Sequence, residues 1–95
     1  MYLKKSEYKL MGFKRSSDIT KKYMAILSNK RTGRVYLMHF GARTYAQYKD
    51  STGLGLYSKN DHLDNDRRRR YVARHKGFVK PGYYSPGYFS MKYLW

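Results

Sequence analysis

The sequence contains no cysteine, which excludes a disulfide framework and a thiolate metal site. Acidic residues are scarce as well, because only 6 Asp and Glu stand against 21 Lys and Arg, and Glu7 is the single glutamate. No run of about 18 apolar residues occurs, so we expect no membrane-spanning segment. The first ten residues, MYLKKSEYKL, lack the apolar stretch of a signal peptide, so none is expected.

These absences also argue against an enzyme. Without cysteine there is no thiol nucleophile, and the carboxylates that a catalytic cation requires are clustered only at Asp61, Asp64 and Asp66, beside arginines that neutralise them. The Gly-x-Gly of residues 53–59, GLGLYSK, is not followed by the Gly-Lys-Ser/Thr of a phosphate loop. We therefore expect no catalysis, no cofactor and no small-molecule substrate. We also expect no metal site, because the histidines lie far apart in the sequence, at His39, His62 and His75.

Positive charge and aromatic rings are what the sequence has in excess. The 95 residues carry a formal net charge of +15, and 12 of them are tyrosines. Such a charge attracts polyanions, whether DNA, RNA, an anionic membrane or an acidic protein face, without indicating which. An aromatic content of 18% is more than the core of one small domain can hide, so some rings are expected to be exposed or to meet a partner.

Hydrophobic periodicity predicts a small antiparallel sheet of about three strands. Residues 6–14 alternate imperfectly between apolar and polar side chains, which is typical of a strand. Apolar runs at 22–28 and 34–40 are joined by NKRTG, a short connection with Asn29 and Gly33 that predicts a β-hairpin over residues 22–40. Both faces of the second run are largely apolar, so we expect a helix to cover one side of the sheet.

Two helices are predicted to follow the sheet, which makes the fold class α+β. Residues 42–50 have good helix formers, whereas 51–60 carry two glycines and predict a loop. The next helix begins after Asp61 or Asp64, since a short carboxylate can accept hydrogen bonds from the free amides of a first helical turn. We thus predict one domain over residues 1–77.

The last segment, residues 78–95, has a different texture. It holds both prolines of the chain, Pro81 and Pro86, and is rich in aromatic residues. Because proline disrupts helix interiors, we predict an extended, irregular aromatic arm here. The arm either wraps over the domain's own sheet, docks on another protein, or stacks on nucleic-acid bases. As a docking strap it would use its largest side chains, which are Tyr88, Phe89, Tyr93, Leu94 and Trp95.

The four consecutive arginines of DNDRRRRYVARHKG (64–77) have two interpretations. They form either a solvated helix face neutralised by the nearby aspartates or a set of phosphate contacts. With a spacing of four, Asp64 and Asp66 are predicted to pair with Arg68 and Arg70. Together with the basic hairpin tip, this leaves six residues as candidate contacts to a polyanion: Lys30, Arg31, Arg34, Arg67, Arg69 and Arg74.

Three stretches occur together in one order: FGARTYAQYKD (40–50), the spacing Asp64–x2–Arg67–x3–Tyr71–x2–Arg74–His75, and GYFSMKYLW (87–95). This set resembles a family of small, basic, uncharacterised proteins encoded by large nucleocytoplasmic DNA viruses, especially algal viruses. The resemblance covers roughly residues 34–95. The family has no assigned catalytic residues, so none is transferred to this chain.

The resemblance implies a viral context. We expect a non-enzymatic virion structural protein, a minor capsid or internal capsid-associated protein that docks on larger capsid proteins. Such a protein would be made in the host cytoplasm or nucleus and would lie inside or under the capsid shell. The alternative, which composition favours, is a basic nucleic-acid-binding protein associated with the viral genome.

Overall fold

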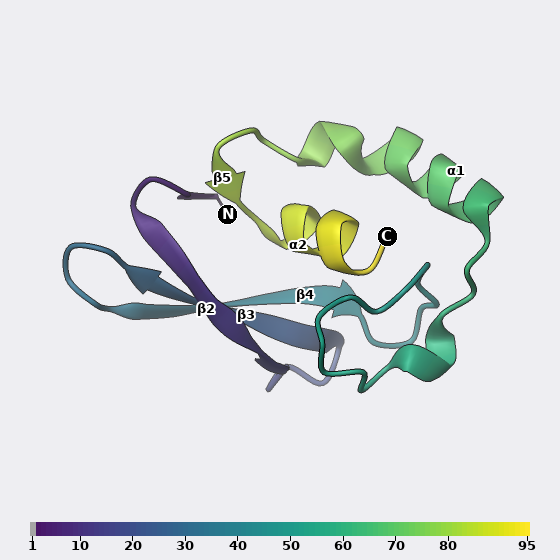
Figure 1. Cartoon of the computed structure of the whole chain (residues 1–95), viewed down its shortest axis with the longest axis horizontal. Helices are drawn as coiled ribbons and strands as arrows, with labels where there is room; N and C mark the ends of the chain where they lie inside the picture. The colour runs from purple at the N-terminus through teal and green to yellow at the C-terminus, as the bar shows by residue number, and fades with distance from the viewer. Residues whose placement is uncertain (1) are drawn as a thin grey trace.

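An antiparallel sheet and two helices make up the structure, and the computed structural model describes residues 2–95 of the chain (Figure 1). The main sheet has the strand order β2–β3–β4, and a separate short ribbon pairs β1 with β5. The α+β class, the three-stranded sheet and the 22–40 hairpin are therefore confirmed. The elements in chain order are β1 (Leu3–Lys4), β2 (Tyr8–Arg15), β3 (Lys21–Asn29), β4 (Val35–Ala42), the single-turn helix η1 (Ser58–Asn60), α1 (Asn65–His75), the single-turn helix η2 (Lys76–Phe78), β5 (Tyr83–Tyr84) and α2 (Pro86–Tyr93).

The turn of the β3–β4 hairpin uses the two residues that the sequence indicated. The side-chain oxygen of Asn29 accepts hydrogen bonds from the amides of Arg31 and Thr32, at 2.9 and 3.1 Å. Gly33 has a φ angle of +75°, a conformation that residues with a side chain adopt only with strain. Its amide donates to the Asn29 carbonyl at 2.8 Å, which closes the loop.

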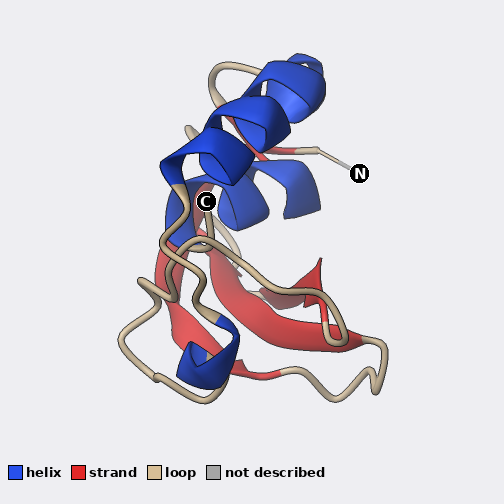
Figure 2. Cartoon of the chain, turned by 90° about the vertical axis from the view of Figure 1, so that its right-hand side faces the viewer, coloured by secondary structure: helices blue, strands red, loops and turns tan. Residues whose placement is uncertain are grey.

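The core lies between one face of the sheet and α2. Alternate residues of β3 and β4 point into it, namely Tyr23, Ala25, Leu27, Met38 and Phe40, all at most 2% exposed. Figure 2 shows the order of the layers, with the sheet at the bottom, α2 above it and α1 outermost. On the opposite face of the sheet, Val35 and Leu37 remain 62% and 42% exposed. One helix therefore covers one face, as the periodicity of β4 predicted.

The prediction of an extended C-terminal arm is wrong, because α2 occupies residues 86–93 and belongs to the core. Ser85 caps this helix through a hydrogen bond from the Tyr88 amide to its hydroxyl at 3.1 Å, and Pro86 occupies the first turn. Proline is favoured there, since the amide that it lacks has no partner in a first turn anyway. Phe89 and Leu94 are 0% and 1% exposed within the same core as the strands. Of the three alternatives for this segment, the structure has the one in which it wraps over the sheet.

The predicted helix at 42–50 is also wrong. The backbone of this segment makes its hydrogen bonds with distant parts of the chain: the Gln47 amide donates to the Asn60 carbonyl at 3.1 Å, and the Lys49 amide donates to the Leu94 carbonyl at 3.1 Å. A helix would direct these groups to neighbours within the segment. The two helices of the fold are therefore α1 and α2, and residues 43–57 form a long loop that packs beside the C-terminal end.

A buried polar network fixes this loop. Lys22 and Gln47 are 1% and 0% exposed, and the Lys22 ammonium donates to the Gln47 side-chain oxygen and to the Tyr45 carbonyl. The Gln47 amide nitrogen in turn donates to the Tyr57 carbonyl and to the Asp61 carboxylate, both at 2.7 Å. Burial lowers the pKa of Lys22, although the charge of Asp50 opposes the shift. Because buried polar groups are costly unless paired, these contacts hold the backbone of Tyr45 in place.

Candidate functional site

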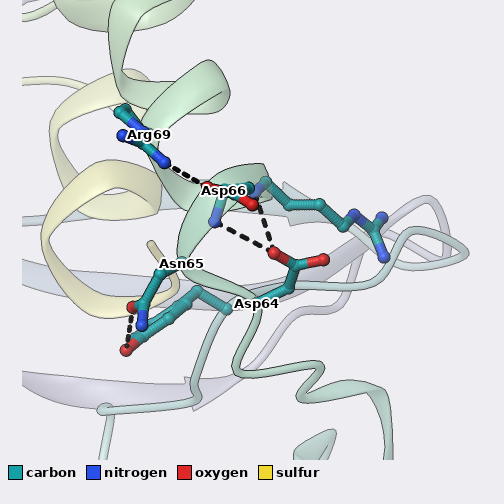
Figure 3. Close-up of polar contacts among 6 residues, drawn as sticks. Asp64, Asn65, Asp66 and Arg69 are labelled. Atoms are coloured by element: carbon teal, nitrogen blue, oxygen red, sulfur yellow. Dashed lines mark hydrogen bonds and ion pairs between the residues drawn. The ribbon is translucent and has the colours of Figure 1, made fainter.

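Helix α1 is positioned by the cap that the sequence predicted. The Asp64 carboxylate accepts hydrogen bonds from the amides of Asp66 and Arg67, at 2.9 and 3.2 Å (Figure 3). These hydrogen bonds lower the pKa of Asp64. Acidic residues lie at the start of the helix and basic residues at its end, which matches the helix dipole. The beginning of the arginine run is therefore fixed within one turn of Asp64.

The five arginines of α1 have three different environments. Asp66 forms an ion pair with Arg69, three residues ahead, and not with Arg70 as the spacing of four predicted (Figure 3). Arg68 does not pair with Asp64: its Nε donates to the main-chain oxygen of Trp95 at 2.8 Å, and its guanidinium lies 4.8 Å from the ring centroid of Tyr48. The prediction that Arg69 is free is thus wrong, since Asp64 serves the backbone and Asp66 reaches the nearer arginine.

Arg67, Arg70 and Arg74 are the arginines that remain free. All three are exposed, and within residues 2–95 their guanidinium groups make no hydrogen bond or ion pair. A helix turns by 100° per residue, so positions 67, 70 and 74 lie on one face, spread over about 10 Å of the axis. Arg70 is therefore unpaired, and Arg69, which was predicted to be free, is paired with Asp66.

A stack of three rings lies beside this face. The Tyr71 ring is nearly parallel to the Trp95 ring, at 4° and 4.1 Å between centroids, and it stacks on the His75 ring at 4.0 Å. The His62 ring also packs against Trp95, tilted by 54° with 5.1 Å between the ring centroids. Burial raises the pKa of Tyr71 and lowers that of His62, so in both rings it favours the neutral form. The stack attaches α1 to the C-terminal residue and makes a rigid aromatic surface next to the arginines.

The arginines and rings together line a hollow of about 750 Å³ on the surface. It is lined by residues of α1 and by the loop at Thr44–Ala46, which the Lys22 network holds. Two large rings there are open to solvent, because Tyr45 is 71% exposed and Phe78 is 60% exposed. The residues that line the hollow are Thr44, Tyr45, Ala46, Arg67, Arg70, Tyr71, Arg74, His75, Phe78 and Trp95. The site thus combines three free cations with exposed aromatic faces.

The other predicted polyanion contacts lie elsewhere. Lys30, Arg31 and Arg34 are exposed on the tip of the β3–β4 hairpin. Figure 1 shows this tip at one end of the long axis of the molecule, with α1 towards the other end. The longest dimension of the chain is 41 Å, so the two basic groups form separate patches.

The five residues predicted to dock on a partner are also divided. Phe89 and Leu94 are buried inside the chain and are not accessible to another protein, which corrects their assignment. Tyr88 and Tyr93 are half-buried and pack against the same core, and Lys5 places its ammonium 4.1 Å from the Tyr88 ring centroid. Trp95 is half-buried in the stack. Of the five, only Trp95 lines the hollow.

Sequence reasoning missed Arg70, Tyr45 and Phe78 as members of the site. The 100° rotation per residue groups Arg70 with Arg67 and Arg74, so this signal was present. No local pattern brings Tyr45 to α1, because a network of long-range hydrogen bonds places it there. Within residues 2–95, no group of three or more His, Asp and Glu side chains is arranged to hold a metal ion. The same part of the chain contains no helix with the length and apolarity needed to cross a membrane.

Comparison with known proteins does not place the chain in a family. No protein-family model matches it, and neither a curated protein nor a solved structure is similar to it.

Proposed function

We propose that the chain is a nucleic-acid-binding protein that contacts phosphates through the free arginine face of α1. The observation that carries the proposal is the hollow at Arg67, Arg70 and Arg74, where three unpaired guanidinium groups meet exposed rings. Guanidinium groups suit phosphate oxygens, since they donate two parallel hydrogen bonds to them. The net charge of +15 adds a long-range attraction to any polyanion. The local arrangement supports a specific contact surface in addition to this general attraction.

The test compares two triple variants that remove the same charge. One replaces Arg67, Arg70 and Arg74 with glutamine, and the other replaces Lys30, Arg31 and Arg34 with glutamine; all six side chains are exposed. Affinity for a fluorescein-labelled oligonucleotide is measured against salt concentration. Removing one arginine or lysine that neutralises a phosphate reduces the slope of log affinity against log salt by about 0.7–0.9.

We expect the α1 variant to reduce the slope by about 2 and the hairpin variant to reduce it by less than about 1. Circular dichroism of both variants checks that the fold is retained. Equal reductions would mean that net charge alone attracts the oligonucleotide, and the proposal would then be wrong.

The second candidate function is the structural role in a virion that the family resemblance implies. Two of the five side chains predicted to dock on a capsid protein cannot do so, because Phe89 and Leu94 are buried inside the chain. What favours a protein partner instead is the far face of the sheet, where Val35 and Leu37 are exposed. Threonine is polar and, being β-branched, is suited to a strand. Replacing both residues with threonine should therefore release the chain from capsid shells emptied of DNA if that face docks on a capsid protein.

A further inference from the structure

A second hollow continues the first along α1. It has a volume of about 320 Å³ and is lined by Tyr2, Ser85, Pro86 and Gly87 together with Tyr71, His75 and Phe78. The last three residues also line the larger hollow, so the two hollows adjoin at these rings. Both volumes are in the range of about 300–1,000 Å³ that is usual for sites of small organic ligands. We call this pair of hollows the α1 groove.

Two rings in the α1 groove have faces left for a ligand. Tyr71 is covered on both sides by His75 and Trp95. Tyr45, in contrast, is 71% exposed, and Phe78 is 60% exposed with one tilted neighbour, His75, at 5.9 Å. Exposed aromatic side chains that line a basic groove are typical of sites where unpaired bases stack. The free arginines lie on the same groove, where they can contact the phosphates between such bases.

We propose that the α1 groove binds single-stranded nucleic acid, with unpaired bases stacked on Tyr45 and Phe78 and phosphates on Arg67, Arg70 and Arg74. This inference rests on the proposed function and specifies its ligand. Bases of a duplex are stacked on one another and cannot enter the hollows.

The experiment uses the full 95-residue chain and three probes of equal length. They are a labelled 12-nucleotide single strand, the corresponding duplex, and a 12-nucleotide abasic strand that has the phosphates without the bases. At one fixed salt concentration we expect the single strand to bind at least ten-fold more tightly than either other probe. The double variant Tyr45→Ala/Phe78→Ala should lose at least ten-fold in affinity for the single strand, since stacking on a single ring contributes about that factor or more. Its affinity for the abasic strand should not change.

The matched control is Ile19→Ala/Val35→Ala, which removes two apolar side chains that are 78% and 62% exposed away from the groove. It should bind all three probes as the unchanged chain does. Tyr45→Ala by itself provides a second test, since the Tyr45 side chain is the more exposed of the two rings in the groove. Trp95 is the only tryptophan and lines the larger hollow, so its fluorescence should change with the single strand and not with the abasic strand.

The outcomes separate the two proposals. If the single strand, duplex and abasic strand bind equally, while the α1 arginine variant still weakens all of them, the base-stacking inference is wrong and phosphate contact by α1 stands. A preference for the duplex would likewise overturn the inference and indicate that α1 contacts double-stranded DNA. If the α1 and hairpin arginine variants behave alike, the proposed function fails.

Discussion

Phe89 should be one of the side chains on which the stability of the fold depends most. It is 0% exposed and contacts the rings of Phe13, Phe40 and Tyr84 at centroid distances of 5.9, 5.4 and 5.5 Å. Replacing a buried Phe with Ala costs about 3–5 kcal/mol, and aromatic pairs add to the loss. A chain of this length has a free energy of unfolding of about 5–14 kcal/mol. Phe89→Ala should therefore remove a large fraction of the stability of the protein.

The matched control is Phe78→Ala, the same substitution at a ring that is 60% exposed. It should change the free energy of unfolding by less than about 0.5 kcal/mol, as surface substitutions usually do. Urea denaturation followed by circular dichroism measures both. With a urea dependence of about 1–3 kcal/mol per M, Phe89→Ala should lower the unfolding midpoint by at least about 1 M relative to Phe78→Ala.

Phe89→Leu keeps most of the apolar volume and provides a measurable variant if Phe89→Ala does not fold. It should have an intermediate midpoint. If Phe89→Ala and Phe78→Ala unfold at the same urea concentration, then α2 does not belong to the core. The last residues would then be accessible to a partner, and the interpretation of residues 78–95 as a docking strap would have to be restored.

Two further predictions concern the backbone of β4 and the pH dependence of stability. Gly41→Ala should destabilise the protein by about 1–3 kcal/mol more than Gly33→Ala. Both glycines have similar φ angles, +77° at Gly41 and +75° at Gly33, so the backbone strain of an added side chain is similar at the two positions. An added Cβ at Gly41 would lie 2.8 Å from the buried Leu94 side chain, whereas one at Gly33 would have no atom within 4 Å. Equal losses of stability in urea denaturation would contradict the packing of Leu94 against β4. Burial, assisted by the hydrogen bond to Asp50, raises the pKa of Tyr23 from 10.0 to about 12. Between these pH values the folded chain keeps a proton that the unfolded chain loses, so the free energy of unfolding falls as the pH rises from 10 to about 12. The difference in free energy of unfolding between the wild type and Tyr23→Phe should therefore shrink over this range. A difference that stays constant would refute the burial of the Tyr23 hydroxyl.

Local signals in the sequence predict much of the fold. The NKRTG connection and the alternation on both sides of it are sufficient for the hairpin, and Asp64 is recognisable as a helix cap. The start of α2 is also encoded, because Ser85 followed by Pro86 is a favourable cap and first residue. The prediction of an extended arm fails at this point because it treats proline only as a residue that disrupts helices.

What the sequence does not predict depends on contacts between distant segments. Good helix formers in 42–50 are overridden by the burial of Gln47, whose polar atoms bond to three other parts of the chain. Spacings of three and four are both suitable for an ion pair on a helix, so the choice of Arg69 by Asp66 does not follow from the sequence. The hollow itself depends on the loop at Tyr45 and the end of the chain at Trp95 meeting at α1.

Helix α1 contains no fully buried residue, whereas α2 places Phe89 in the core. No α1 residue belongs to the core between the sheet and α2, so local unfolding of this helix costs less free energy than opening the core strands. Its five arginines repel one another, and one of them is neutralised by an ion pair with Asp66. A polyanion bound there would reduce this repulsion and stabilise the ordered helix by mass action. If the groove binds a polyanion as proposed, its occupancy and the order of α1 are thermodynamically linked. Salt, which screens both the repulsion and the attraction, then favours the ordered helix in the free chain and weakens the binding of the polyanion.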